Sequence, residues 1–355
     1  MDTGASIPAI VLGGTGYVAG ELLRLLAAHP RFELAGILSD SQPGEAVGAA
    51  FPHLASAYHK TRFSSQEEIE RLITELPQTA VFCAAPHGAA ARLIDGLLAA
   101  AQRAGTRPRV VDISADYRFR SAQAYEAVYK HPHAAPQRLA EFTCAVPEHL
   151  ASVSTPHVAH PGCFATAVLL ASVPLLMLGL TAPTLYVSGI TGSTGSGRKP
   201  VEGTHHPLRH SDLYGYNPLA HRHTPEIVAC ALAATGVEAD FAFVPHSGPF
   251  ARGIYVTVQG ALKSSLDTPR VLAALREVYA RAPFVQVSDS PPRIKNIVAS
   301  NYAHLSAAAN GRTVTVMCAL DNLAKGAAGG AMQWMNRLLG LPETTGLTAP
   351  AAGWT

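Results

Sequence analysis

The sequence predicts an α/β protein with two domains: a doubly wound domain on a parallel sheet, then an α+β domain whose sheet is mostly antiparallel. Three observations support this prediction. The 355 residues exceed the ~250 at which a single hydrophobic core stops growing. Over about the first 150 residues, apolar runs typical of strands alternate with segments of helical periodicity. After Pro161 one long apolar helix is followed by several strand patterns.

The doubly wound domain is expected over residues 1–160. A glycine turn joins the apolar run Ile7 to Leu12 to a leucine-rich helical pattern that ends at Pro30. Further elements then alternate, with strands over 32–38, 80–84 and 110–113 and helices over 67–76 and 89–104. This alternation predicts parallel strands joined by right-handed helical crossovers.

The second domain is expected over residues 161–321. Strand patterns occupy 185–190, 241–244, 253–259 and 313–320, and a helix over 269–281 precedes the last of them. The final helical pattern, within 322–355, is expected to return to the first domain. The apolar stretch Cys163 to Leu180 has about the ~18-residue minimum of a membrane-spanning helix. Its proline and small residues, and its lack of flanking anchors, favour a buried core helix instead.

Composition argues against several classes of function. With 27 basic and 25 acidic residues and no basic run, nucleic-acid binding is not expected. Five cysteines without a CxxC pair argue against a disulfide framework or a zinc ribbon and favour a reducing compartment. The N-terminus lacks the basic start and apolar core of a signal peptide. A cytoplasmic protein without nucleic-acid or membrane partners is therefore expected.

A glycine motif marks a candidate cofactor site. Gly14, Gly16 and Ala19 spell G-x-G-x-x-A between the first strand and the first helix. There, glycines let the backbone approach a pyrophosphate and the helix N-terminus supplies N–H donors. The first domain is therefore predicted to be Rossmann-like and to bind a dinucleotide. Asp40, at the end of the second strand, indicates NAD, whereas Ser39 could donate to the 2′-phosphate of NADP.

Cys163 is the candidate nucleophile. It directly precedes the long apolar helix, so its thiol should lie at a helix N-terminus, where the macrodipole favours the thiolate. A thiolate attacks an activated carbonyl, and the resulting thioester can accept a hydride. The alternative, a small buried apolar residue, fits Cys83 and Cys318 better because both lie within apolar runs.

Two histidines are candidates for the general acid/base. Histidine changes charge near neutral pH, and the segment HRHTPE contains His221 and His223. With Glu226 and the upstream His205 they could instead hold a metal, but their spacing is not typical of zinc sites, so no metal is expected.

Basic residues in predicted loops are candidate anion contacts. Arg118, Arg198 and Arg222 could each bind a substrate anion or be a solvated surface charge. The stretch TGSTGSGRK, residues 191–199, could cradle a phosphate with successive backbone N–H groups, or act as a hinge.

Together these motifs resemble the N-acetyl-gamma-glutamyl-phosphate reductase family of arginine biosynthesis, with its lysine-pathway relatives that act on carrier-protein-linked aminoadipyl or glutamyl phosphates. The resemblance covers nearly the whole chain. It is carried by GGTGYVAGELLRLLAAHP, APHG, VDISADYRF, AVPE, HPGCFATA, GSGRK, HRHTPEI, RGI and DNLAKGAAGGAMQ. Three positions depart from the family's usual N-P-G-C-Y-P-T: His160, Phe164 and Ala165. None of them removes a reacting atom.

The resemblance implies roles for individual residues. Cys163 would be the nucleophile and His223 the acid/base, with His221 as second choice. The substrate would contact Ser114, Arg118, Arg198 and Arg222. The cofactor, NADP(H), would contact Gly13, Gly14, Thr15, Gly16, Tyr17, Val18, Ser39, Pro86, Gly195, Asn322 and Lys325.

The expected reaction is the NADPH-dependent reduction of N-acetyl-gamma-glutamyl phosphate to N-acetylglutamate 5-semialdehyde, with release of phosphate, through a cysteine thioester. Three alternatives stay open: a carrier-linked aminoadipyl or glutamyl phosphate, another semialdehyde dehydrogenase such as the aspartate type, and a non-catalytic nucleotide sensor or metal-binding scaffold. The resemblance also implies a small-molecule substrate and a homo-oligomer, dimer or tetramer.

Overall fold

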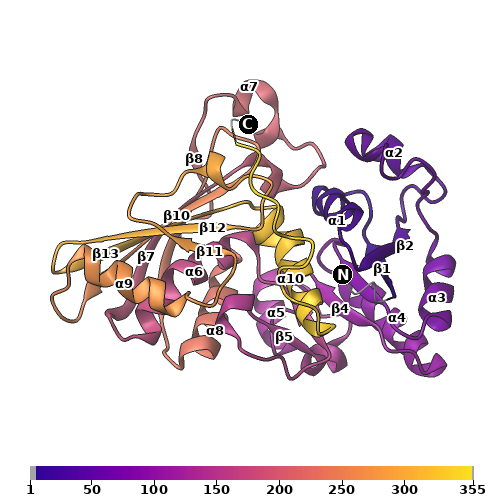
Figure 1. Ribbon diagram of the computed structural model, residues 1–355, viewed down its shortest axis with the longest axis horizontal. Helices are drawn as coiled ribbons and strands as arrows, with labels where there is room; N and C mark the ends of the chain where they lie inside the picture. Colours follow the sequence, from indigo (N-terminus) through magenta and orange to yellow (C-terminus); the bar gives the residue numbers. More distant parts are fainter. Residues whose placement is uncertain (1–4, 354–355) are drawn as a thin grey trace. The chain divides into compact units, whose positions relative to one another are not determined.

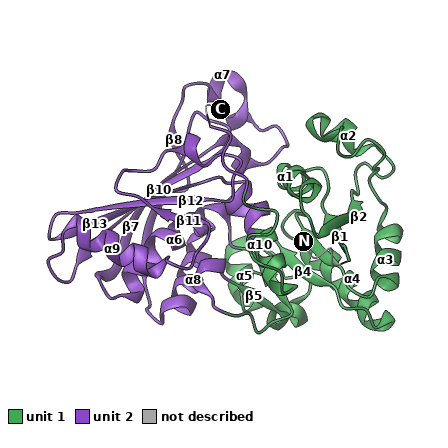
Figure 2. Cartoon of the chain, viewed as in Figure 1, with its two compact units in different colours: residues 1–144, 152–160, 331–348 green, residues 145–151, 161–330, 349–355 purple. Residues whose placement is uncertain are grey.

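Figure 1 shows the computed structural model, which describes residues 5–353. The ends of the predicted domains at residues 1 and 355 lie outside this range. The chain forms two compact units (Figure 2). Unit 1 comprises residues 1–144, 152–160 and 331–348, and unit 2 comprises residues 145–151, 161–330 and 349–355.

Unit 1 is built on a sheet of parallel strands in the order β2-β1-β3-β4-β6-β5. The strands are β1 (Ile7–Leu12), β2 (Phe32–Leu38), β3 (Ala80–Cys83), β4 (Arg109–Asp112), β5 (Phe142–Cys144) and β6 (His157–Ala159). The helices are α1 (Tyr17–Ala27), α2 (Val47–Ala50), α3 (Gln66–Glu75), α4 (Ala90–Ala104), α5 (Ala122–Tyr129) and most of α10 (Gly329–Leu338). The predicted doubly wound architecture is confirmed.

Local sequence explains where the helices of unit 1 begin and end. Ser65 and Glu68 form a capping box at the start of α3: the Ser65 hydroxyl accepts from the Glu68 amide, and the Glu68 carboxylate accepts from the Ser65 amide. Gly105 ends α4 in the left-handed conformation, with φ of 77°. Buried apolar side chains of β1, β3 and α4 fill the core between helices and sheet.

Unit 2 is built on a sheet with strand order β11-β12-β13-β10-β7-β9-β8. Its strands are β7 (Thr181–Thr191), β8 (Tyr214–Gly215), β9 (Asp240–Ser247), β10 (Ile254–Leu262), β11 (Val285–Val287), β12 (Ala303–Ala309) and β13 (Thr313–Leu320). The pairs β11–β12 and β7–β9 are parallel and the other pairs are antiparallel, so the prediction of a mostly antiparallel sheet is confirmed.

The helices of unit 2 are α6 (Cys163–Met177), α7 (His206–Arg209), α8 (Thr224–Thr235) and α9 (Thr268–Val278), and a π-helical turn spans Ala324–Ala328. Helix α6 packs against β7, β10 and β13, and its residues 164–176 are all buried. The long apolar stretch is therefore the core helix of unit 2. Within residues 5–353, no helix is long and apolar enough to cross a bilayer.

Several short strands had no counterpart in the prediction. Strands β5 and β6 have three residues each and β8 has two, too few for a period-2 pattern to emerge. Strand β12 reads AHLSAAA and lacks the β-branched residues that mark strands. These strands depend on pairing with neighbours rather than on local propensity.

Candidate active site

Cys163 is the first residue of α6. Gly162 precedes it as N-cap in extended conformation, and no side chain of the described residues caps the helix. The first-turn N–H groups and the helix dipole therefore face the region of the thiol, which favours the thiolate. Cys163 is half-buried, whereas Cys83 and Cys318 are fully buried. Burial raises the pKa of both of those thiols well above the usual range.

A cavity of about 430 Å³ in unit 2 opens beside Cys163. Its wall includes both candidate histidines, a candidate arginine and part of the glycine loop that follows β7. Its lining residues are Cys163, Phe164, Thr191, Gly195, Ser196, Tyr214, Tyr216, Asn217, Ala220, His221, Arg222, His223 and Ser247. The fold thus brings together side chains separated by more than eighty positions in the sequence, which no local pattern predicts.

His223 lies against the residue that precedes the thiol. A β-carbon added to Gly162 would come within 2.5 Å of both Cε1 and Nε2 of His223, so only glycine permits this approach. The His221 ring packs edge-on against the His223 ring, with centroids 4.7 Å apart, and its Nδ1 accepts a hydrogen bond of 3.2 Å from the His223 amide. Burial, aided by the charge of Arg222, lowers the pKa of His221 to about 4. His221 is therefore neutral at neutral pH.

Glu226 is a component of the site that the sequence reasoning considered only as a metal ligand. Its carboxylate is buried, and Oε1 accepts a hydrogen bond of 2.7 Å from the Gly162 amide. The same oxygen lies 2.8 Å from the position of an added Gly162 β-carbon, next to the His223 ring. Glu226 follows His223 by three positions in the first turn of α8, a spacing that puts two side chains side by side.

Aromatic side chains form much of the cavity wall. The His221 ring packs edge-on against Phe164, with ring centroids 5.7 Å apart, and against Tyr216 at 5.6 Å. Burial, and then the negative charge of the nearby Cys163 thiolate, raise the pKa of the Tyr216 hydroxyl. Tyr216 therefore stays protonated and able to donate. Tyr216 was not predictable from the sequence, because a lone tyrosine in a loop carries no spacing signal.

The candidate anion contacts lie in different parts of the structure. Arg222 and Gly195 line the cavity, whereas Arg198 is exposed and is not among the lining residues. Ser114 and Arg118 are buried in unit 1. The Ser114 hydroxyl donates to Asp112, and Arg118 donates to the carbonyl oxygens of Ile113 and His160.

Two residues that the resemblance assigns to the cofactor are buried and engaged within unit 2. The Asn322 side chain accepts from the Gly253 amide at 2.8 Å and donates to the Thr194 hydroxyl at 2.9 Å. Lys325 is 0% exposed and forms an ion pair with Glu148. Their assignment to the cofactor stays a prediction.

The glycine turn of unit 1 fits a pyrophosphate. Gly13 has φ of +83°, and a β-carbon there would lie 2.5 Å from the Ala85 amide nitrogen. Gly14 donates to the Leu38 carbonyl at 2.7 Å, which ties the turn to the end of β2. Gly16 is the N-cap of α1, and no described atom lies within 4 Å of a β-carbon placed on it. The open space lies where uncapped N–H groups can bind an anion.

The other predicted cofactor residues of unit 1 lie along the turn and at strand ends. Thr15 and Val18 are partly buried, whereas Tyr17 and Pro86 are exposed. Ser39 is buried after β2, where its hydroxyl accepts from the Gln42 amide, while Asp40 is exposed. The structure thus presents both the serine and the acidic residue at the strand end, as the sequence indicated.

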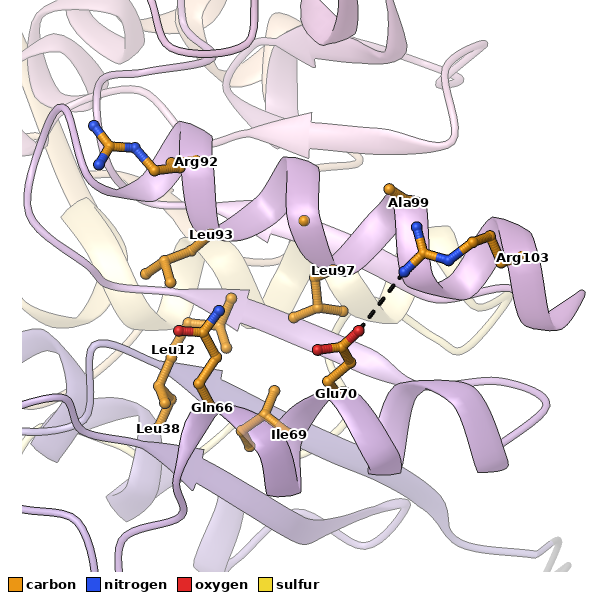
Figure 3. A pocket seen from close by; sticks show the side chains of 11 residues that line it. Leu12, Leu38, Gln66, Ile69, Glu70, Arg92, Leu93, Leu97, Ala99 and Arg103 are labelled. Atoms are coloured by element: carbon orange, nitrogen blue, oxygen red, sulfur yellow. Dashed lines mark ion pairs between the residues drawn. The ribbon is translucent and has the colours of Figure 1, made fainter.

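A second cleft, of about 320 Å³, lies in unit 1 between α3 and α4 (Figure 3). Leu12 and Leu38, the last residues of β1 and β2, belong to its apolar lining, and Arg92 lies at its edge. Arg103 and Glu70 approach within 3.7 Å across it. The cleft adjoins the glycine turn, because Leu12 directly precedes Gly13.

The described residues contain no group of three His, Cys, Asp or Glu side chains placed to hold a metal ion. His205 directly precedes the short helix α7 and His206 is its first residue, and neither lines the cavity. The five cysteines are free thiols.

Comparison with family profiles gives matches along most of the chain. Residues 8–148 match the profile described as semialdehyde dehydrogenase, NAD binding domain. Residues 163–322 match the profile described as semialdehyde dehydrogenase, dimerisation domain. The first match covers most of unit 1, without β6 and α10, and the second covers most of unit 2. The predicted fold class is confirmed.

Curated relatives cover almost the full length. N-acetyl-gamma-glutamyl-phosphate reductase of Nitrosococcus oceani is 37% identical over 348 residues, which are 96% of this chain and 98% of the relative. The enzymes of the same name from Methanopyrus kandleri and Ectopseudomonas mendocina are 37% and 38% identical, each over 96% of this chain and 97% and 98% of their own length.

Solved structures share the fold at low identity. Aspartate semialdehyde dehydrogenase II of Vibrio cholerae, complexed with ASA, superposes with a TM-score of 0.67 at 14% identity, covering 95% of this chain and 98% of that one. Aspartate semialdehyde dehydrogenase of Candida albicans, solved with NADP, gives 0.62 at 14% identity, covering 95% and 99%. At these identities the likeness extends to the fold alone.

Proposed function

We infer the function from one premise: the chain belongs to the N-acetyl-gamma-glutamyl-phosphate reductase family. It is an NADP-dependent oxidoreductase of the phosphorylating semialdehyde dehydrogenase type, in arginine biosynthesis. Its reaction converts N-acetyl-gamma-glutamyl phosphate to N-acetylglutamate 5-semialdehyde and phosphate. The observation that carries the assignment of residues is the cavity shared by Cys163, Arg222 and His223.

The first half of the reaction forms a thioester. The Cys163 sulfur attacks the γ-carbonyl carbon, the bond from that carbon to the phosphate oxygen breaks, and phosphate leaves with the electron pair. The N-terminus of α6 stabilises the attacking thiolate. Arg222, an exposed residue that lines the cavity, supplies a positive charge for an anionic group of the substrate.

The second half releases the aldehyde. The glycine turn would hold NADPH, which when bound would supply a hydride to the thioester carbon. His223 protonates the oxyanion that then develops, which gives a thiohemiacetal. The same imidazole takes the proton back as the carbon–sulfur bond breaks, so the aldehyde leaves and the thiolate is restored. Glu226 holds the Gly162 amide directly before Cys163, and His221 holds the backbone of His223.

Replacement of Cys163 by serine tests this assignment. The variant should lose phosphate-dependent reduction of NADP by the semialdehyde, because a serine hydroxyl is not ionised at neutral pH. NADPH affinity, measured by fluorescence titration, should stay near that of the unchanged protein. Substantial turnover by the variant would contradict the role of Cys163.

The identity of the acyl group is tested with a substrate panel. Purified protein is assayed at fixed NADPH with N-acetylglutamyl, aspartyl and aminoadipyl phosphates, the last also linked to a carrier protein. We expect kcat/KM to be highest for N-acetylglutamyl phosphate, since specificity is a ratio of these constants. A higher value for a carrier-linked substrate would move the protein to the lysine-pathway branch. Absence of turnover with every member would favour the nucleotide-sensor alternative.

The protein is proposed to act as a homodimer, or as a tetramer made of two such dimers, that forms through the open face of the unit 2 sheet. The dimerisation-domain profile covers this unit. Leu185 and Val187 of β7 are buried beneath helices, whereas Tyr186 between them is 60% exposed. Tyr186→Glu should therefore reduce the mass measured by light scattering. Arg270→Glu, on the exposed side of α9, should not.

The cytoplasm is proposed as the compartment of the enzyme. The thiol chemistry supports this proposal, because Cys163 must stay reduced to act. The free state of the other four cysteines also suits a reducing environment.

A further inference from the structure

A π-helical turn lies directly beside the nucleophile within unit 2. The turn, Ala324–Ala328, has the hydrogen bonds between residues five positions apart that define a π-helix. Gly326 donates to the Asp321 carbonyl at 2.9 Å, and Ala328 donates to the Leu323 carbonyl at 2.8 Å. All of its residues are buried. Single π turns are rare and occur frequently at functional sites.

Gly326 packs its bare α-carbon against Cys163. A β-carbon placed on Gly326 would lie 2.8 Å from the Cys163 β-carbon and 3.1 Å from its α-carbon. A separation of 2.8 Å between carbon atoms is far inside the ~3.5 Å of a favourable contact. Even the smallest side chain at position 326 must therefore move Cys163 or the turn. The backbone of the turn is the surface that limits where the β-carbon of the nucleophile can lie.

The start of the turn is held by Asp321. Its Oδ1 accepts from the Leu323 and Ala324 amides at 2.8 and 2.9 Å. Arg252 binds both carboxylate oxygens, with Nε and Nη2 each at 3.0 Å. A fully buried carboxylate with a two-pronged arginine and several amide donors has little freedom to rotate.

The middle of the turn is held by a buried ion pair. Lys325, which directly precedes Gly326, places Nζ 2.5 Å from Oε1 of Glu148, and the two side chains are 0% and 1% exposed. The ammonium also lies 5.6 Å from the centroid of the Phe284 ring. Removing two charges from water costs about as much as their attraction returns, so such a pair contributes little stability. It does restrict the position of the turn, because each charge tolerates few other places in the core.

We propose that Lys325 and Gly326 are positioning residues for the reductase reaction: the ion pair fixes the π turn, and the turn fixes the depth and direction of the Cys163 side chain. The proposal rests on Cys163 being the nucleophile, as proposed above. It gives Lys325 a function that needs no contact with the cofactor.

Gly326→Ala is the direct test. A displacement of the sulfur of about 1 Å costs on the order of 100-fold in rate. We therefore expect kcat to fall 10- to 100-fold while KM and the NADPH affinity change less than threefold. Alkylation of Cys163 by iodoacetamide should change in rate and in pH profile, which a general loss of stability does not produce in a folded protein. Circular dichroism shows whether the variant folds.

A second variant keeps the proposal falsifiable if Gly326→Ala does not fold. Lys325→Met with Glu148→Met removes both charges, so no lone charge is left in the core. Its kcat should fall at least tenfold at unchanged NADPH affinity. The matched control removes the exposed pair Arg276–Asp289 in the same unit, by Arg276→Met with Asp289→Met, and should keep its kcat.

Three results would overturn the proposal. The first is a kcat within twofold of the unchanged protein in a folded Gly326→Ala variant, or in the double variant when Gly326→Ala does not fold. The second is a loss of NADPH affinity in the double variant that accounts for its loss of rate, which would assign Lys325 to the cofactor. The third is an equal loss in the control. Failure of the proposed function itself is recognised separately, by turnover in the Cys163→Ser variant.

Discussion

Among the single residues of the cavity, the two histidines differ in what their surroundings let them do. His221 uses Nδ1 to accept from the backbone, and its pKa of about 4 keeps it neutral at pH 7. Such a group is a poor proton donor near neutrality. The His223 ring instead faces Gly162, the residue before Cys163. The geometry therefore supports His223 as the acid/base, with His221 as its support.

His223→Asn and His221→Asn should separate these roles. Loss of the acid/base should reduce kcat by about 10²- to 10⁴-fold, the usual contribution of a proton-transferring side chain. Loss of His221 should reduce kcat less, since an asparagine side chain can also accept from the backbone. The measurement is kcat against pH for both variants. A larger loss in His221→Asn would exchange the two assignments.

Glu226→Gln tests the carboxylate that the sequence indicated only as a possible metal ligand. A glutamine can still accept from the Gly162 amide, so the fold should persist, but the negative charge beside His223 is lost. A nearby negative charge favours the imidazolium, so its removal should shift the basic limb of the kcat profile to lower pH. We expect kcat to fall about tenfold on the same grounds. An unchanged pH profile would limit Glu226 to a packing role.

At the scale of elements, Gly13 and Gly16 in the turn from β1 to α1 differ in backbone conformation and in the space around them. Gly13 needs its positive φ and has no room for a β-carbon, whereas Gly16, the N-cap of α1, has a φ of −78° and open space in front of it. No side chain of the described residues fills the space in front of Gly16. This space is the approach that a pyrophosphate requires.

Gly16→Ala should therefore lower NADPH affinity without lowering stability. An alanine fits the N-cap backbone, so the thermal midpoint should change little, while its methyl group enters the space that the pyrophosphate needs. Gly13→Ala should lower the midpoint instead, because strain at positive φ costs about 1–3 kcal/mol. Fluorescence titration and thermal unfolding of both variants check this. Equal effects on the two properties would contradict it.

At the scale of the whole molecule, buried histidines couple stability to pH. Burial lowers the pKa of His29, His149 and His221 to about 4 and that of His157 to about 3. In addition, Nδ1 of His29 accepts from the Arg31 and Phe32 amides, and protonation would end both hydrogen bonds. The folded chain thus binds fewer protons than the unfolded chain, in which histidine titrates near 6.5.

Stability should therefore fall as the pH drops from 7.5 towards 4.5. The histidine contribution is complete above about 6.5 and is lost as the pH falls towards the folded pKa values. Burial raises the pKa of Asp112 to about 6, which acts in the opposite direction, but it is one group against four. Urea unfolding midpoints at pH 7.5, 6.0 and 5.0 measure the net effect of these groups on stability. A midpoint that is constant or rises with acid would contradict the burial of these rings.

Elements with a strong local signal were predictable. The strand and helix around the glycine turn follow from apolar periodicity, and the apolar helix after Cys163 could be recognised by length and composition alone. Strands β5, β6 and β8 were not, because two or three residues show no periodicity. The His-rich stretch after residue 204 indicated chemistry by composition, yet His205 and His206 do not line the cavity.

The sequence by itself determined the order of most elements, the glycine turn, the position of Cys163 at a helix start and, through its motifs, the family. These depend on residues close together in the chain, where spacing alone limits geometry. Only the tertiary structure decided that Glu226 reaches Gly162 and that Gly326 lies against Cys163. Such contacts join segments tens to hundreds of positions apart, and packing across the core of unit 2, not local periodicity, sets them.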